Sequence, residues 1–274
     1  MTTSSTTESA RSAWTGMVQV DDTALAVTDT GGPGIPVIYL NGSYASQRHW
    51  RRVTADLGPG YRHITFDERA RGRSKLASDY SFEACVRDID AVLAARGVDR
   101  PLLVGWSYGA LLGVHWASRN PDRARGVVGV DGPYPVGWTE EAEHEEIRKV
   151  LRRMRLMLPL ARRLGLAARF SGEEHVRVAI EAHLLHAAAG PLLEELAVPV
   201  RYVVASGEAL GSRDDLQTEM RKTIEPILAR NPNLRVSAKV TSNHGSVLRK
   251  DSPAVADVVR ELAASTSAQD RRSR

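Results

Sequence analysis

Short apolar runs alternate with helix-like stretches along most of the chain. Ile35 to Leu40 is a nearly continuous run of Ile, Val and Tyr, and similar runs occupy His63 to Phe66, Pro101 to Val104 and Gly126 to Val130. Runs of this kind are typical of strands that are buried on both faces of a mainly parallel sheet. Parallel neighbours need crossover connections, so the pattern predicts an α/β fold with helices on both faces of the sheet.

The stretch between the second and third runs predicts one of these helices. From Phe82 to Arg96 the apolar residues recur at helical spacing, with Ser81 placed as the N-cap and Gly97 as the terminator. Cys85 falls on the apolar face, which favours a core role over a nucleophilic one.

Further elements extend the predicted sheet at both ends of the chain. Gly16 to Thr30 reads as an antiparallel hairpin around Asp21 and Asp22. After residue 197 we expect two strands and two helices: strands at Val198 to Val204 and Leu234 to Val240, and helices at Asp214 to Arg230 and Pro253 to Ala264.

The alternation of strands and helices stops between Asp131 and Val198. Gly137 to Leu196 has no β-branched run and reads as helical. Acidic residues follow Thr139 and arginines cluster further on, as the helix dipole favours, and this explains the charges better than substrate binding does. We expect residues 137–196 to form a helical cap that excludes water from a site at the strand ends.

The composition is that of an ordinary soluble globule, with 42% hydrophobic and 26% charged residues. No apolar run reaches the roughly 18 residues of a membrane span. The net charge is only +4 and the sequence contains no recognisable nucleic-acid-binding motif, so nucleic-acid binding is not favoured. Residues 1–13 lack the features of a secretory signal, and a single cysteine precludes an intrachain disulfide. These features lead us to expect a cytoplasmic protein with flexible tails at residues 1–13 and 266–274; they carry no signal for oligomeric state.

The most informative motif is Gly105-Trp106-Ser107-Tyr108-Gly109, which lies between a predicted strand and a predicted helix. A Gly-x-Ser-x-Gly string at such a junction forces the serine into a tight turn and holds its hydroxyl at the end of the sheet. The start of the following helix offers N–H groups to developing negative charge.

With this motif the chain resembles the α/β-hydrolase family from roughly Gly16 to Ala264. Asn41-Gly42-Ser43, Asp67 to Ser74 and Asn243-His244-Gly245 support the resemblance. It implies a mainly parallel eight-stranded sheet flanked by helices, with a core of residues 14–136 and 197–265 and a helical cap inserted after the sixth strand. Two positions depart from the family pattern: Asn41 stands where His is usual, and Ala70 where Gly is usual.

The resemblance implies a catalytic triad with Ser107 as nucleophile and His244 as base. A serine hydroxyl needs a base to take its proton during attack, and His244 is the only histidine after the cap. The backbone N–H groups of Ser43 and Tyr108 are the expected oxyanion donors.

The acid of the triad is less clearly marked in the sequence. The usual family position, after the seventh strand, holds Leu210. A known variant places the acid after the sixth strand, where this chain has Asp131, and we favour that residue. Glu208 is the next candidate, and Asp214 and Asp215 are remote ones that resemble helix-start residues.

Aromatic residues near the predicted strand ends are candidates for the pocket wall: Tyr44, Trp106, Tyr134 and Trp138. His175, His183 and His186 lie close together in the chain without the His-Glu-x-x-His string of zinc proteases, so we expect no metal. Gly31 to Gly34 precedes a strand and opens no helix, so we expect no nucleotide cofactor.

The sequence therefore predicts a cofactor-independent serine hydrolase. Its expected substrate is a small to medium, largely apolar ester, thioester or lactone, cleaved through an acyl-enzyme. Two alternatives remain open: carbon-carbon bond cleavage or cyclisation in secondary metabolism at the same site, and a non-catalytic ligand-binding protein on this scaffold.

Overall fold

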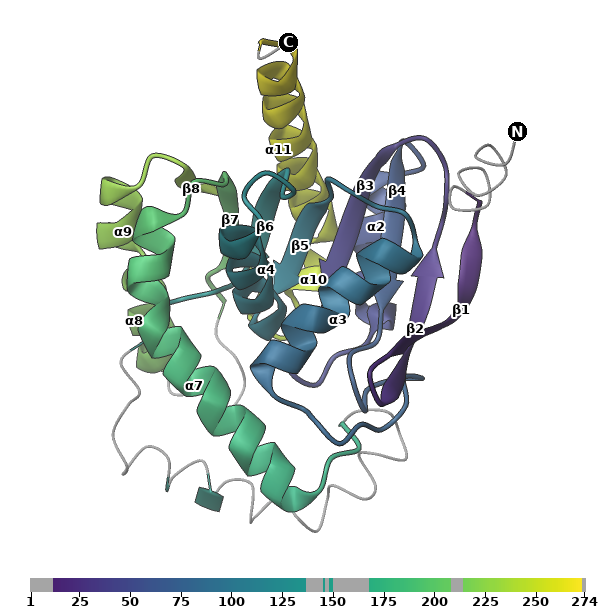
Figure 1. Ribbon diagram of the computed structural model, residues 1–274. Coiled ribbons are helices and arrows are strands. Elements are labelled where there is room, and N and C mark those ends of the chain that lie inside the picture. Colours follow the sequence, from purple (N-terminus) through teal and green to yellow (C-terminus); the bar gives the residue numbers. More distant parts are fainter. Residues whose placement is uncertain (1–11, 137–144, 146–147, 150–167, 208–213, 273–274) are drawn as a thin grey trace.

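The computed structural model describes residues 12–136, 145, 148–149, 168–207 and 214–272. One eight-stranded sheet runs through the molecule in the order β1-β2-β4-β3-β5-β6-β7-β8 (Figure 1). Both pairings of β2 are antiparallel and the strands from β4 to β8 pair in parallel, as predicted. The strands are β1 (Trp14–Val20), β2 (Thr23–Asp29), β3 (Ile35–Leu40), β4 (Tyr61–Phe66), β5 (Leu102–Trp106), β6 (Gly126–Val130), β7 (Val200–Ala205) and β8 (Leu234–Val240).

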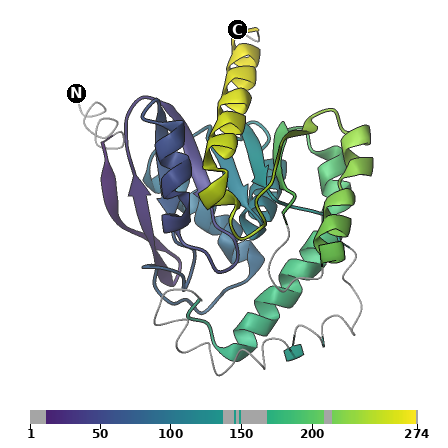
Figure 2. The same cartoon turned by 180° about the vertical axis from the view of Figure 1, so that it is seen from behind.

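Helices cover both faces of the sheet and enclose a separate apolar core on each. On one face lie α3 (Phe82–Ala95) and α4 (Tyr108–Arg119). The opposite face carries α2 (Arg51–Leu57), the short α10 (Val247–Lys250) and α11 (Ser252–Arg272), which Figure 2 shows from behind. This three-layer arrangement confirms the α/β fold that the alternating apolar runs predict.

The helix predicted from Phe82 follows its sequence signals closely. The Ser81 hydroxyl accepts a hydrogen bond from the N–H of Ala84, and Gly97 adopts a φ of 57° just beyond the helix end. Cys85 is buried in the core, and burial raises the pKa of its thiol to about 12. The thiol is therefore protonated and unreactive at neutral pH.

The single helix predicted over Asp214 to Arg230 is in fact two, α8 (Asp214–Lys222) and α9 (Glu225–Arg230). Pro226 lies in the first turn of α9, where its missing N–H costs nothing; in the interior of one long helix it would break the hydrogen-bond ladder. The chain therefore leaves α8 after Lys222 and begins a new helix at Glu225.

The flexible tail predicted from residue 266 is instead helical as far as Arg272, where α11 ends. Thr266 is buried, and its hydroxyl donates to the carbonyl of Leu262 one turn earlier, so a polar residue is accommodated within the helix. The end of α11 extends beyond the sheet in Figures 1 and 2. The tail expected at residues 1–13 lies almost wholly outside the described residues.

The predicted cap is described only in its second half. There α7 (Gly172–Glu195) forms one long helix whose N-cap hydroxyl, on Ser171, accepts a hydrogen bond from the N–H of Glu174. This helix contacts α3, α4 and α9 (Figure 1). Most of residues 137–167, including the helix expected from Thr139, lie outside the described residues.

Across the part of the chain that the structure describes, no helix combines the length and the apolar character that crossing a bilayer requires.

Candidate active site

Ser107 lies in the tight turn that the Gly-x-Ser-x-Gly motif predicts, between β5 and α4. Its φ of 56° and ψ of −117° are unusual for a residue with a side chain. Both flanking glycines are required by close backbone contacts: a Cβ at position 105 would lie 2.3 Å from the carbonyl oxygen of Gly109, and one at position 109 would lie 2.1 Å from that of Leu40. The turn therefore exposes the serine hydroxyl at the strand end.

Three side chains from separate parts of the chain form one hydrogen-bonded line. The Nε2 atom of His244 lies 3.1 Å from the Oγ of Ser107, and its Nδ1 lies 2.8 Å from the Oδ2 of Asp131. Because an ionised carboxylate only accepts, Nδ1 carries the proton and Nε2 presents its lone pair to the serine hydroxyl. This arrangement suits a nucleophile, a base and an orienting acid.

Asp131 is buried at the end of β6 and is held ionised by its surroundings. Burial raises the pKa of its carboxyl, but hydrogen bonds from His244 and Arg221 outweigh that effect and lower the pKa below its usual value. The hydroxyl of Tyr134 (2.9 Å) and the N–H of Ala205 (3.2 Å) also donate to its Oδ1. Of the other acid candidates, Glu208 lies outside the described residues, and Asp214 and Asp215 begin α8.

The two predicted oxyanion donors face the same space as Ser107. Ser43 and Tyr108 both line the cavity beside it, and within the described residues neither backbone N–H has a hydrogen-bond acceptor. The Nε of Arg71 donates to the carbonyl of Ser43 (2.6 Å) and so anchors the peptide that follows this residue. Unpaired N–H groups at this position are available to a developing oxyanion.

Asn41, where the family usually has His, organises the loop before Ser43. Its amide nitrogen donates to the carbonyl of Phe66 and to Glu68, both at 2.7 Å, and its amide oxygen accepts from the indole of Trp50 at 2.8 Å. Glu68 also accepts from the backbone N–H of Asn41, and burial raises the pKa of this glutamate to about 7. Asn41 therefore has a structural role, as does the fully buried Trp50.

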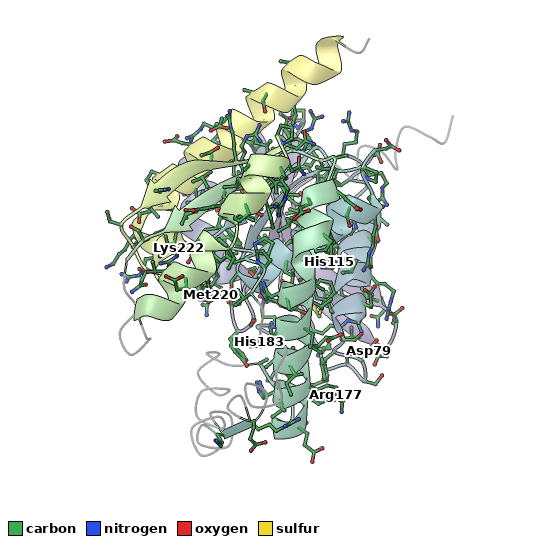
Figure 3. The ribbon with its side chains drawn as sticks, turned by 90° about the vertical axis from the view of Figure 1, so that its left-hand side faces the viewer. Asp79, His115, Arg177, His183, Met220 and Lys222 are labelled. Atoms are coloured by element: carbon green, nitrogen blue, oxygen red, sulfur yellow. The ribbon has the colours of Figure 1, made fainter. Side chains whose placement is uncertain are left out.

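A cavity of about 210 Å³ opens beside Ser107. It is walled by residues of the strand-end loops, α7 and α8: Ser43, Ser107, Tyr108, Asp131, Gly132, Tyr134, Ala182, His183, His186, Met220, Arg221 and His244. Figure 3 shows His183 of α7 and Met220 of α8 on the sides of the two helices that face each other. Of the four aromatic residues predicted to line a pocket, Tyr134 does so.

Tyr44 and Trp106 do not line this cavity, contrary to expectation. Tyr44 lies beside Ser43 in the tight turn that the N–H of Ala45 closes by donating to the carbonyl of Gly42. The residue is 43% exposed, and its ring packs on His175 of α7. Trp106 precedes Ser107, so its side chain points to the opposite face of the sheet, where its indole N–H donates to the carbonyl of His244. Trp106 therefore supports the histidine loop, and Trp138 lies outside the described residues.

Sequence reasoning missed Met220 and Arg221 as cavity residues. Both come from α8, a helix with no motif, and only the packing of α8 beside Tyr134 brings them to the site. From the sequence, His183 and His186 were considered only as metal ligands, a role that the missing His-Glu-x-x-His string argues against, and not as cavity residues. Among the described residues no three His, Cys, Asp or Glu side chains converge as metal ligands would.

Comparison with known proteins identifies the fold family of the chain. The model of the α/β-hydrolase fold family matches residues 35–194, more than half of the chain. A haloalkane dehalogenase of Agrobacterium fabrum is 37% identical over 97 residues, which are 35% of this chain and 32% of that protein. Epoxide hydrolase B of Mycobacterium tuberculosis is 33% identical over 115 residues, 40% of this chain and 32% of the relative. The matched region thus spans about a third of the length of these relatives.

Solved structures share the fold over most of the chain. A thermophilic esterase from Thermogutta terrifontis superposes with a TM-score of 0.72 at 19% identity, covering 93% of this chain and 99% of the esterase. A thioesterase domain from the curacin biosynthetic pathway gives a TM-score of 0.63 at 17% identity, covering 90% and 99%. The family model matches more than half of the chain, and the sheet order and the serine turn are consistent with it. The chain therefore belongs to the α/β-hydrolase fold family.

Proposed function

We propose that this protein is a cofactor-independent serine hydrolase that cleaves a small, largely apolar ester, thioester or lactone through an acyl-enzyme. The observation that carries the proposal is the hydrogen-bonded line from Ser107 through His244 to Asp131, with distances of 3.1 and 2.8 Å. Such a line activates a hydroxyl that is otherwise a poor nucleophile.

Each residue has a defined task in the proposed reaction. The Oγ of Ser107 attacks the acyl carbon while Nε2 of His244 takes its proton, and the N–H groups of Ser43 and Tyr108 bind the oxyanion. Asp131 stabilises the imidazolium that forms. When the tetrahedral intermediate collapses, His244 returns the proton to the leaving alcohol or thiol. Water then attacks the acyl-serine, with His244 again taking and returning the proton.

The serine nucleophile favours acyl substrates over the substrates that the names of the curated relatives suggest. If Ser107 displaced a halide or opened an epoxide, the product would be an alkyl ether of serine. An ether has no carbonyl for an activated water to attack, so the enzyme would stop after one event. An acyl-serine, in contrast, is hydrolysed by the same base and the same oxyanion donors.

The size of the cavity supports a small acyl group. Its volume of about 210 Å³ is below the roughly 300–1,000 Å³ of sites for drug-sized ligands. Ala182, Met220 and the ring of Tyr134 give part of the wall an apolar character. A short acyl chain fits this space better than a long fatty chain does.

The test is to replace the nucleophile and to label it. Ser107→Ala should lower the hydrolysis of p-nitrophenyl butyrate by at least 10³-fold, roughly the loss seen when a triad member is removed, with an unchanged melting temperature. A fluorophosphonate probe should add one mass equivalent to the wild type and none to Ser107→Ala. Hydrolysis that survives in the variant contradicts the proposal.

The same measurements separate the alternatives. A folded wild type that neither turns over nor takes up the probe favours a binding protein. Labelling of Ser107 without a burst of released alcohol from any activated ester favours carbon-carbon cleavage or cyclisation, because only ester cleavage accumulates an acyl-enzyme with release of an alcohol.

A further inference from the structure

His186 lies on α7 and lines the same cavity as Ser107, but it takes no part in the catalytic line. Its Nδ1 is 3.2 Å from the backbone carbonyl oxygen of Tyr134, the residue whose hydroxyl binds Asp131. A carbonyl oxygen can only accept, so Nδ1 must carry the hydrogen in this bond. The second ring nitrogen, Nε2, then presents a lone pair whenever the ring is neutral.

The surroundings keep this ring neutral. Burial is the main cause that lowers the pKa of His186 to about 4; the nearby His183, His115 and His244 act in the same direction, against the hydrogen bond to Tyr134. At pH 7 the ring is uncharged, so Nε2 is a hydrogen-bond acceptor and not a donor.

This acceptor has no partner among the residues that the structure describes. Within the described residues no donor lies within hydrogen-bond distance of Nε2, whereas Nδ1 is satisfied by Tyr134. The same stretch of wall includes the apolar side chains of Ala182 and Met220. An acceptor held at a partly apolar wall is costly to desolvate unless the bound molecule supplies a donor.

We propose that His186 is a specificity residue that accepts a hydrogen bond from a hydroxyl or amide N–H on the acyl part of the substrate. This deepens the proposed function and rests on it, because it assigns to the acyl group of that reaction a donor-bearing substituent. The substrate class is then a short hydroxyacyl or acylamino ester, thioester or lactone.

The experiment compares acyl groups that differ only in the donor. One pair is the p-nitrophenyl ester of 3-hydroxybutyrate, in both enantiomers, against that of 3-methoxybutyrate. The other pair is the ester of N-acetylglycine against that of N-acetylsarcosine. The methyl group removes the donor in each pair, so a preference within the first pair identifies a hydroxyl and one within the second identifies an amide.

In the wild type, kcat/KM should favour the donor-bearing ester of one pair by about tenfold, the scale of one neutral hydrogen bond. His186→Phe should bring that ratio close to one. His186→Gln, whose side-chain carbonyl can accept, should keep part of the preference and serves as the second variant if the phenylalanine does not fold. If His186 served only to hydrogen-bond Tyr134, His186→Phe would lower kcat/KM equally for both esters of a pair and leave their ratio unchanged.

Met220→Leu is the matched control, since it alters the same cavity with little change in volume and no change in hydrogen bonding. It should leave the ratio within each pair unchanged. Equal rates within both pairs in the wild type overturn the proposal, as does a preference that persists in His186→Phe.

A binding measurement distinguishes this failure from failure of the proposed function. The Ser107→Ala variant should bind 3-hydroxybutyramide or N-acetylglycinamide more tightly than its methylated counterpart, as measured by ligand-observed NMR without any turnover. If the wild type hydrolyses none of the esters but this difference in binding is observed, the proposed reaction is wrong and the proposed role of His186 stands. The reverse outcome, in which Ser107 is essential but the amides of each pair bind equally, keeps the reaction and removes the role.

Discussion

Ser107 and Asp131 share an unusual backbone conformation at the ends of neighbouring strands. Their φ angles are 56° and 48°, in a region that residues with side chains rarely occupy. Each is held by the sheet: the N–H of Ser107 donates to the carbonyl of Val130, and that of Asp131 donates to the carbonyl of Val203. Pairing of β5, β6 and β7 therefore stabilises both turns and aims the two side chains at His244.

Asp131→Asn tests the acid at this scale. An asparagine can orient the His244 ring in the wrong tautomer and cannot stabilise the imidazolium, so kcat should fall by roughly 10³- to 10⁴-fold with the fold retained. Steady-state kinetics with p-nitrophenyl butyrate and the far-ultraviolet circular dichroism spectrum measure the two effects.

Glu208→Gln is the companion variant, because Glu208 is the second acid candidate in the sequence. It should keep kcat within about twofold of the wild-type value. A large loss in this variant, together with an active Asp131→Asn, would move the acid to position 208.

At the scale of elements, α4 lies so close to β3 that one helical position admits no side chain. A Cβ at Gly109 would lie 2.1 Å from the carbonyl oxygen and 2.4 Å from the carbonyl carbon of Leu40. These are backbone atoms at the end of the strand that leads to Asn41 and Ser43, so they cannot move independently of the oxyanion loop. The close contact of helix and strand is what brings Tyr108 and Ser43 to one cavity.

Gly109→Ala should therefore lower both stability and activity. The better helix propensity of alanine offers at most about 1 kcal/mol, whereas the clash costs about 1–3 kcal/mol or more. We expect a net loss in the free energy of unfolding, measured with urea, and a fall in kcat as the oxyanion donors shift.

Gly172→Ala, at the first residue of α7, is the contrasting variant. Beyond its chain neighbours, a Cβ at this position meets no atom within 4 Å. This variant should keep its stability or gain up to about 1 kcal/mol. A Gly109→Ala protein as stable as Gly172→Ala would show that the contact with β3 is not restrictive.

At the scale of the whole molecule, a buried charge cluster ties the N-terminal hairpin to the rest of the sheet. Asp29, at the end of β2, accepts from the guanidinium groups of Arg62 on β4 and Arg96 after α3, both at 2.7 Å, and from the N–H of Gly31 at 2.8 Å. Burial raises the pKa of Asp29, but the two arginines outweigh it and the pKa is lowered. Three segments that are far apart in the sequence are thus joined through one carboxylate.

Asp29→Asn should destabilise the protein by about 3–5 kcal/mol at pH 7, because it leaves two buried cations without a counter-charge. The lowered pKa means that the carboxylate contributes stability above its unfolded pKa near 4 and loses that contribution as the pH falls through its folded pKa. The difference in the free energy of unfolding between wild type and variant, measured by denaturant titration, should therefore become smaller below about pH 4. Asp257→Asn, which removes an exposed pair with Arg260, should cost less than about 1 kcal/mol.

The pattern of apolar runs was enough to predict most of the sheet. Ile35 to Leu40 and Gly126 to Val130 are strands with the predicted bounds, because burial on both faces leaves a continuous apolar signal. Leu234 to Val240, at the edge of the sheet, also has the predicted bounds, but its apolar and polar residues alternate. The serine turn was also predictable, since Gly105 and Gly109 are demanded by local backbone contacts. The joint in Asp214 to Arg230 was missed because the helical period continues across Thr223 and Ile224, where the backbone leaves α8 before α9 begins with Pro226 in its first turn.

The sequence by itself determined the layers, the mainly parallel pairing that follows from crossover connections, and the turn that exposes Ser107, because each depends on spacing along the chain. The order of the strands in the sheet came from the structure. Only the tertiary structure decided which carboxylate meets His244 and which side chains form the cavity wall. Those choices depend on how strand ends and α8 pack side by side, and on the face to which a side chain such as that of Trp106 points. No local spacing encodes such distances between segments that are more than a hundred residues apart.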